Sequence, residues 1–94
     1  MAEIVLADSA WQDLNAITDY IALDSIRYAQ EFADRIFKRI EQLKTHPQSG
    51  RVVPEFQSDQ LRELILGKYR IVYRIYNPQK IVVLRIIHGA KLLE

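Results

Sequence analysis

The sequence predicts an α+β domain in which a helical hairpin packs on one face of a small, mainly antiparallel sheet. Two observations lead to this fold class. Apolar residues recur every three or four positions over residues 9–45, as on one side of a helix, whereas residues 61–88 are rich in strand-forming residues. Gly and Pro stand between these segments, where turns belong. The expected order is strand, helix, helix, strand, strand, strand, and 94 residues suit a single domain spanning 1–94.

The chain should open with a short strand and a first helix. Residues 3–7 form an apolar run that polar residues end. Ser9 and Gln12 then match the capping-box pattern, in which each side chain satisfies a free backbone amide at the start of a helix. We therefore expect a helix over residues 9–22, with an apolar stripe made of Ala10, Leu14, Ile17 and Ile21.

A second helix should follow after a tight connection. Asp24-Ser25 offers its N-cap, and Pro47 ends it at about residue 45, because the residue before a proline is pushed out of the helical region. So short a connection predicts an antiparallel hairpin. The second apolar stripe consists of Ala29, Phe32, Ile36, Ile40 and Leu43.

Three strands of an antiparallel meander should complete the fold. They are Leu61–Leu66, Tyr69–Tyr76 and Ile81–His88, separated by Gly67 and by Asn77-Pro78-Gln79. One face of this sheet would cover the helices, and the other would stay open for function.

Composition narrows the class of protein and of partner. The chain has no cysteine, which excludes disulfides and thiolate chemistry. It shows no signal peptide and no apolar run near the roughly 20 residues of a membrane span, so we expect a cytoplasmic protein without membrane contact. The net charge of +1 is unevenly distributed: residues 1–34 carry seven acidic residues and one basic, and the remainder has an excess of seven positive charges. This asymmetry favours an anionic partner.

Alternation along residues 69–76 separates a basic face from an apolar one. Arg70 and Arg74 share one face, and Tyr69, Ile71, Tyr73 and Ile75 share the other. The apolar set suits the core, because burying unpaired guanidinium groups is costly. We therefore expect Arg70 and Arg74 on the open face, where replacing Arg70 by Ala would cost about 1 kcal/mol or less.

The register of the last hairpin decides which residues join these arginines. An odd loop places His88 on the face of Arg70 and Arg85 on the other face. An even loop does the reverse and gives the cleaner core, and a bulge could satisfy both needs. The sequence leaves this choice open.

The histidines and glycines indicate neither a metal nor a cofactor. His46 lies at a helix end, where the helix dipole explains it, and His88 ends a strand as a structural or a catalytic residue. Their spacing is not that of a zinc site. The glycines are too far apart for a phosphate-binding loop.

Several segments, taken in order, resemble one known family. They are Gly50-Arg51-Val52-Val53-Pro54-Glu55, Leu61-Arg62-Glu63-Leu64, Tyr69-Arg70-Ile71-Val72-Tyr73 and Ile87-His88-Gly89-Ala90, preceded by Ala10-Trp11-Gln12-Asp13-Leu14, Tyr20-Ile21-Ala22 and Phe32. Together they resemble the RelE/ParE toxins of type II toxin-antitoxin systems over nearly the whole chain. The resemblance implies a RelE/ParE-like fold and a growth-inhibiting toxin neutralised by a cognate antitoxin.

The resemblance also implies a candidate catalytic site. Glu55, Arg70 and His88 occupy the positions of the acid, arginine and histidine of the ribonuclease branch, which would cleave messenger RNA on the ribosome without a metal. A carboxylate or imidazole could take the proton of a ribose 2′-OH while the guanidinium stabilises phosphate charge. The RelE branch uses a basic set instead, to which Arg62, Arg70 and Lys91 could correspond. The chain departs from that pattern at Leu64, where a lysine is expected, and in lacking an obvious C-terminal tyrosine.

Messenger RNA cleavage is the favoured function, with two alternatives. The ParE branch, similar in its helical hairpin and in the His88-Gly89-Ala90 ending, implies inhibition of DNA gyrase by binding. A non-toxic interaction module is the second alternative. We expect nucleic acid or another target to contact Arg51, Arg62, Arg74, Arg85 and Lys91. The antitoxin would cover the helices or add to a sheet edge, and the sequence leaves open whether the free toxin forms a homodimer.

Overall fold

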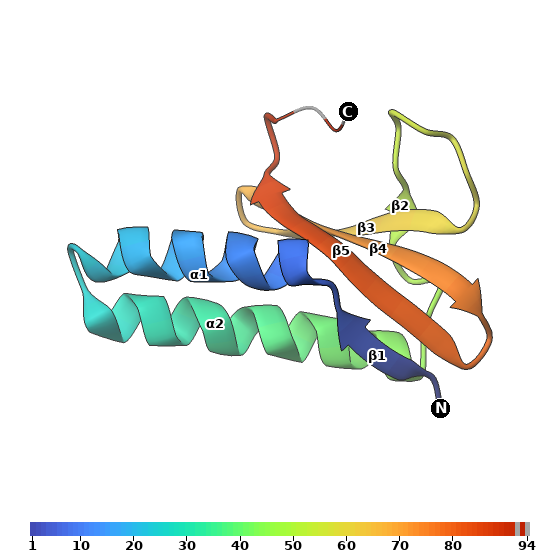
Figure 1. The fold of residues 1–94 in the computed structure, drawn as a ribbon, viewed down its shortest axis with the longest axis horizontal. Coiled ribbons are helices and arrows are strands. Elements are labelled where there is room, and N and C mark those ends of the chain that lie inside the picture. Colours follow the sequence, from blue (N-terminus) through green and yellow to red (C-terminus); the bar gives the residue numbers. More distant parts are fainter. Residues whose placement is uncertain (92, 94) are drawn as a thin grey trace.

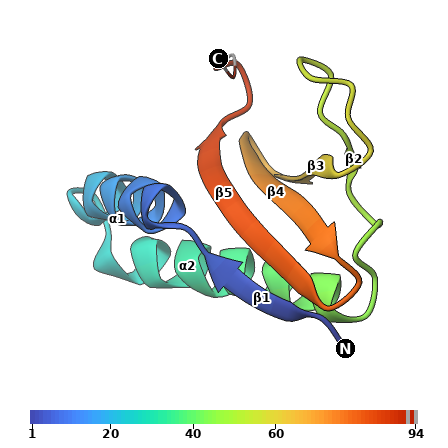
Figure 2. The same cartoon turned by 45° about the vertical axis from the view of Figure 1, so that its right-hand side comes forward.

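The computed structural model describes residues 1–91 and 93, and confirms the α+β class. The elements are β1 (Glu3–Leu6), α1 (Asp8–Ala22), α2 (Ile26–Glu41), the 3-10 turn η1 (Gln42–Lys44), β2 (Arg51–Val52), β3 (Leu61–Leu66), β4 (Tyr69–Asn77) and β5 (Lys80–His88). The strands form one sheet in the order β1-β5-β4-β3-β2, with β1 parallel to β5 and the other neighbours antiparallel. The helical hairpin covers one face (Figures 1 and 2), and we call the opposite face the open face.

Of the two predicted N-caps, the one of α2 is confirmed and the one of α1 is wrong. Ser25 caps α2, because its hydroxyl accepts a hydrogen bond from the Tyr28 amide at 3.2 Å. The capping box at Ser9 was wrong: α1 begins one residue earlier, at Asp8, with no side-chain cap bond. The Ser9 hydroxyl donates instead to the Leu84 carbonyl at 2.6 Å, because the first turn of α1 lies against β5.

The core lies between the helices and the sheet, as the two apolar stripes predict. Ile71 and Tyr73 of β4 are fully buried there, which confirms the apolar face of that strand. The buried cluster consists of Ala2, Ala10, Leu14, Ile36, Ile40, Leu43, Leu64, Ile71, Tyr73, Ile81, Val83 and Ile86. The hairpin extends beyond the sheet (Figure 1), which leaves large apolar side chains such as Leu23 and Ile26 exposed near its tip. No helix in the described part of the chain has the length and apolar character needed to cross a membrane.

Two β-bulges shape the hairpin of β4 and β5. Asn77 lies opposite Lys80, so the turn contains two residues, as an even loop requires. The register then shifts at Tyr76 in β4 and again at Leu84 in β5. Because the extra residues lie on opposite strands, the two shifts cancel and the even register returns beyond them.

This register resolves the choice that the sequence left open. Arg85 lies opposite Val72, and Arg70 lies opposite Ile87, so both arginines are on the open face. His88 lies opposite Tyr69, on the face of the helices. The bulges therefore do not bring His88 to the side of the sheet that carries Arg70.

Candidate functional site

Arg70 lies on the open face but is buried, which corrects the expectation of a freely exposed guanidinium. The residue is only 5% exposed. The loop between β2 and β3, which carries Glu55, and the C-terminal tail, which carries Lys91, both contact its guanidinium. These two segments lie at the same end of the sheet (Figures 1 and 2). The sequence pattern of one strand could not reveal this cover, because it comes from other parts of the chain.

Every donor of the Arg70 guanidinium is used within the protein. Its Nε donates to Glu63 at 2.8 Å, and Nη2 donates to both Glu63 and Glu55. Nη1 donates to Glu55 at 2.8 Å and to the Lys91 carbonyl at 3.1 Å. A guanidinium has five N–H donors, so these five contacts leave none directed at solvent. The two carboxylates raise the pKa of Arg70 further above its ordinary value, with Glu55 the larger cause.

Glu63 is the buried centre of this charge network. Its side chain is fully buried, and each of its oxygens faces a different arginine. Oε1 accepts from Arg70, whereas Oε2 accepts from Nε of Arg51 at 2.8 Å and from its Nη2 at 2.7 Å. Arg51, Glu63, Arg70 and Glu55 thus form a chain of alternating charges with no net charge. Desolvation of Glu63 is offset because both of its oxygens are paired.

Glu55 connects the network to the C-terminal tail. Its Oε2 accepts from Arg70 and also from the Leu93 amide at 3.1 Å. The hydrogen bond from Arg70, followed by the one from the Leu93 amide, lowers the pKa of Glu55 from 4.5 to about 2. At neutral pH this carboxylate is ionised, neutralised by Arg70 and a weak proton acceptor.

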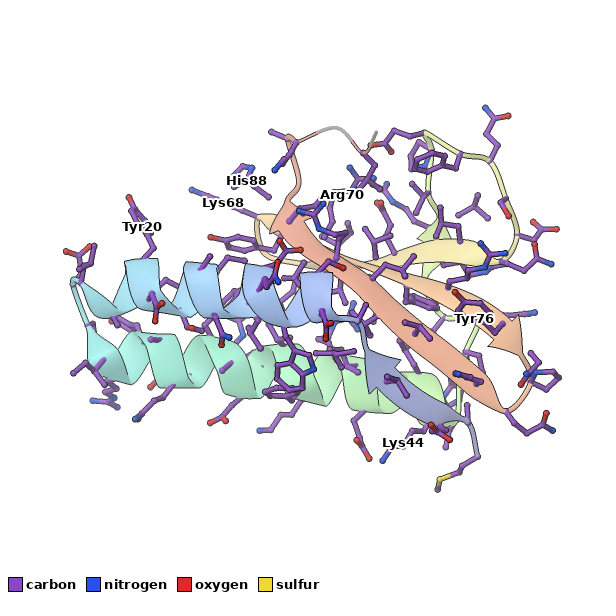
Figure 3. All side chains as sticks on the ribbon, viewed as in Figure 1. Tyr20, Lys44, Lys68, Arg70, Tyr76 and His88 are labelled. Atoms are coloured by element: carbon purple, nitrogen blue, oxygen red, sulfur yellow. The ribbon has the colours of Figure 1, made fainter. Side chains whose placement is uncertain are left out.

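His88 directly follows Ile87, the residue opposite Arg70 on the neighbouring strand β5, and its side chain lies on the helix face of the sheet (Figure 3). Its ring contacts Tyr69 edge-on, with ring centroids 5.8 Å apart, and Nδ1 accepts a hydrogen bond from the Ala90 amide at 3.2 Å. The structure therefore brings Glu55 and Arg70 together and leaves His88 on the opposite side of the sheet.

The remaining cations predicted to bind a target have different surroundings. Arg85 pairs with Asp13 of α1, Nε to Oδ2 at 2.7 Å, and this bond raises its pKa. Arg62 lies opposite Tyr73, on the face of the helices, and donates to backbone carbonyls that include Gly50 at 2.9 Å. Arg62 therefore lies on the other side of the sheet from Arg74, and its predicted contact with a target stays a prediction.

Arg74 and Lys91 are exposed cations beside the open face. Among residues 1–91 and 93, neither has a carboxylate oxygen within 4.0 Å. The Arg74 guanidinium lies 5.1 Å from the centroid of the Tyr76 ring, a cation–π contact. Tyr76 is at the far end of β4 from Arg70 (Figure 3).

A groove of about 890 Å³ runs over this face. It is lined by Phe56, Leu61, Val72, Arg74, Leu84, Arg85, Ile87, Lys91 and Leu93, and we call it the open-face groove. Most of its lining is apolar, and Phe56 from the loop is 47% exposed at its edge. Within the described ranges, no three His, Asp or Glu side chains gather in a way that could hold a metal ion.

Sequence reasoning missed Glu63, although a signal for it was present. Gly67-Lys68 forms a two-residue turn, which places Ile65 opposite Arg70 and Glu63 opposite Val72. Glu63 and Arg70 then share a face as diagonal neighbours. The position of Glu55 carried no such signal, because its loop has no strand register.

The sequence and the fold are similar to those of known toxins. The model of the family described as "ParE toxin of type II toxin-antitoxin system, parDE" matches residues 4–93. Toxin RelE2 of Caulobacter vibrioides is 34% identical over 93 residues, covering 98% of this chain and all of the relative. A solved structure titled "Chromosomal ParDE TA system from P. aeruginosa" superposes with a TM-score of 0.76 at 24% identity, covering 94% of this chain and 96% of the other. At that identity the superposition demonstrates the fold alone.

Proposed function

The chain belongs to the ParE toxin family of type II toxin-antitoxin systems, and from the contacts of Arg70 we propose that it inhibits growth by binding DNA gyrase and not by cleaving messenger RNA. Membership of the family also implies a cognate antitoxin as partner. The order of the two functions expected from sequence is thus reversed, because of the contacts of Arg70 and the surroundings of Glu55 and His88.

The saturated guanidinium of Arg70 carries this proposal. A ribonuclease of the expected type needs an arginine that can donate to the phosphate as charge develops on it. All five donors of Arg70 are already bound to Glu55, Glu63 and the Lys91 carbonyl. A phosphate would have to displace a carboxylate from a nearly buried site and approach the remaining negative charge.

The other two candidate catalytic residues also favour a binding protein. A carboxylate with a pKa of about 2 is a poor base for a ribose hydroxyl, which requires a pKa nearer the working pH. His88 is directed away from Glu55 and Arg70, so it cannot serve the same phosphate without a rearrangement of β5. A toxin that acts by binding needs none of these catalytic contacts.

Expression of the chain without its antitoxin tests the proposal. We expect growth arrest with DNA breaks and altered plasmid supercoiling while transcripts stay intact, and the purified chain should inhibit supercoiling by purified gyrase. His88→Ala should remain fully toxic. Transcripts cleaved within codons, with normal supercoiling, would refute the proposal, and so would the absence of any growth effect.

Messenger RNA cleavage is the second candidate, and the exposure of His88 is the observation that favours it. The histidine lies at the end of β5 beside Lys68, whose carbonyl accepts from the Gly89 amide at 2.6 Å (Figure 3). A histidine next to a lysine could act on a phosphodiester on the helix side of the sheet. In that case His88→Ala would abolish both transcript cleavage and growth arrest.

A further inference from the structure

The open-face groove has two walls that come from segments outside the sheet. One wall is Phe56, which lies in the loop between β2 and β3. The other wall is formed by Lys91 and Leu93 of the C-terminal tail. Glu55 joins the two walls, because it pairs with Arg70 and accepts from the Leu93 amide. The floor between them is formed by strand residues such as Val72 and Leu84. The volume, about 890 Å³, lies within the usual range of ligand sites.

The charges around the groove distinguish a protein ligand from a nucleic acid. Arg51, Arg70 and Arg85 are each paired with carboxylates of the chain itself. In the part of the chain that the structure describes, Arg74 and Lys91 are the lining cations without such a partner. Binding to a nucleic-acid backbone draws its affinity from Lys and Arg side chains that neutralise successive phosphates, so two free cations beside an apolar floor are too few.

The same pair of cations fits an acidic segment of protein. In an extended strand, side chains alternate between the two sides, so apolar residues can enter the groove while neighbouring residues stay at its rim. Leu61 and Leu84, which are partly exposed, would receive the apolar side chains. Carboxylates of the segment would lie within reach of Arg74 at one end and Lys91 at the other.

We infer that the open-face groove seats an extended segment of the target protein in which carboxylates flank apolar side chains, an inference that rests on the proposed function. The occupant is part of the protein that the toxin inhibits. Binding to nucleic acid, to the antitoxin alone or to a second copy of the chain would be contrary outcomes of the test.

Charge reversal tests the inference with a matched control. Arg74→Glu combined with Lys91→Glu should weaken binding to purified gyrase, measured without DNA, on the order of 10²-fold, because like charges would meet at the rim. Lys38→Glu combined with Lys80→Glu makes the same change of net charge at exposed positions outside the groove. This control should bind and inhibit gyrase like the parent chain.

Photocrosslinking gives an independent measurement that does not depend on charge. Replacing Phe56 with p-benzoylphenylalanine should crosslink the toxin to a gyrase subunit at a peptide rich in acidic and apolar residues. The same replacement at Phe37, a comparably exposed ring on α2, should not. The inference would be overturned if only position 37 gave crosslinks and the Arg74→Glu, Lys91→Glu variant still inhibited gyrase. The proposed function would be unaffected by that result. Failure of the parent chain to bind gyrase would instead overturn the proposed function.

Discussion

Arg70 and Glu55 form a two-pronged ion pair in which Nη1 donates to Oε2 and Nη2 to Oε1, each at 2.8 Å. The pair attaches the loop between β2 and β3 to the start of β4, the central strand of the sheet. The same guanidinium holds Glu63 on its other side, so one residue supports both a buried carboxylate and a loop. Parallel bidentate contacts of this kind are among the strongest polar interactions in proteins.

Replacing Arg70 by Ala should destabilise the fold. In this variant the buried Glu63 side chain would keep Arg51 on Oε2, but its Oε1 would lose its only cationic partner among the described residues. Breaking a buried pair typically costs about 3–5 kcal/mol, so we expect a loss near 3 kcal/mol in urea unfolding. Arg74→Ala, an exposed arginine of the same strand, should cost about 1 kcal/mol or less. Equal unfolding midpoints for the two variants would contradict the role given to the network.

Replacing Glu55 by Ala should release the C-terminal tail more than it unfolds the domain. The carboxylate accepts a hydrogen bond from the Leu93 amide, and this bond joins the tail to the loop between β2 and β3. Hydrogen exchange should show faster exchange at Leu93, while the amides of β4 stay protected. Asp59→Ala removes an exposed carboxylate from the same loop and should leave exchange at Leu93 unchanged. An unchanged rate in the Glu55 variant would show that the tail is held by other contacts.

Acidification should release the same contact in a defined pH window. The folded protein lowers the pKa of Glu55 from 4.5 to about 2, so folding favours the ionised carboxylate. The resulting stabilisation is fully present above about pH 4.5 and is lost as the pH falls toward 2. The Leu93 amide signal, followed by NMR, should therefore keep its position at pH 5 and shift only as the pH falls below about 3, with a midpoint near 2. A midpoint near 4.5 would mean that Arg70 does not hold this carboxylate.

Replacing Tyr73 by Phe should destabilise the connection between the helices and the sheet. The buried hydroxyl accepts from the Gly50 amide at 3.0 Å and donates to the Pro47 carbonyl at 2.7 Å, and burial raises its pKa. Phe would leave the Gly50 amide unpaired, a loss of about 1–3 kcal/mol in thermal or urea unfolding. Tyr76→Phe removes an exposed hydroxyl from the same strand and should be neutral. Equal stability of both variants would contradict this account.

The two helices, the strands of the meander and the two faces of β4 followed from the sequence alone, whereas the facing of Arg85 and His88 did not. Ser25, the two helical stripes and the alternation from Tyr69 to Ile75 are signals between neighbours in the chain, and all of them appear in the structure. The resemblance of the ordered segments to the RelE/ParE toxins likewise needed no coordinates, and the family comparison confirms it. Local periodicity suffices for such features, because burial of one face is decided within a few residues.

The contacts of the charged residues on that face depend on segments that are distant in the sequence. Arg70 is on the predicted side, yet a loop 15 residues before it and a tail 21 residues after it turn an exposed guanidinium into a buried one. The direction of His88 follows from the two-residue turn after Asn77, because the two bulges cancel, and the alternation pattern alone left that turn length open. Ion pairs form between groups that are close in space, so the chemistry available to Arg70 was set by the path of segments that carry no periodic signal of their own.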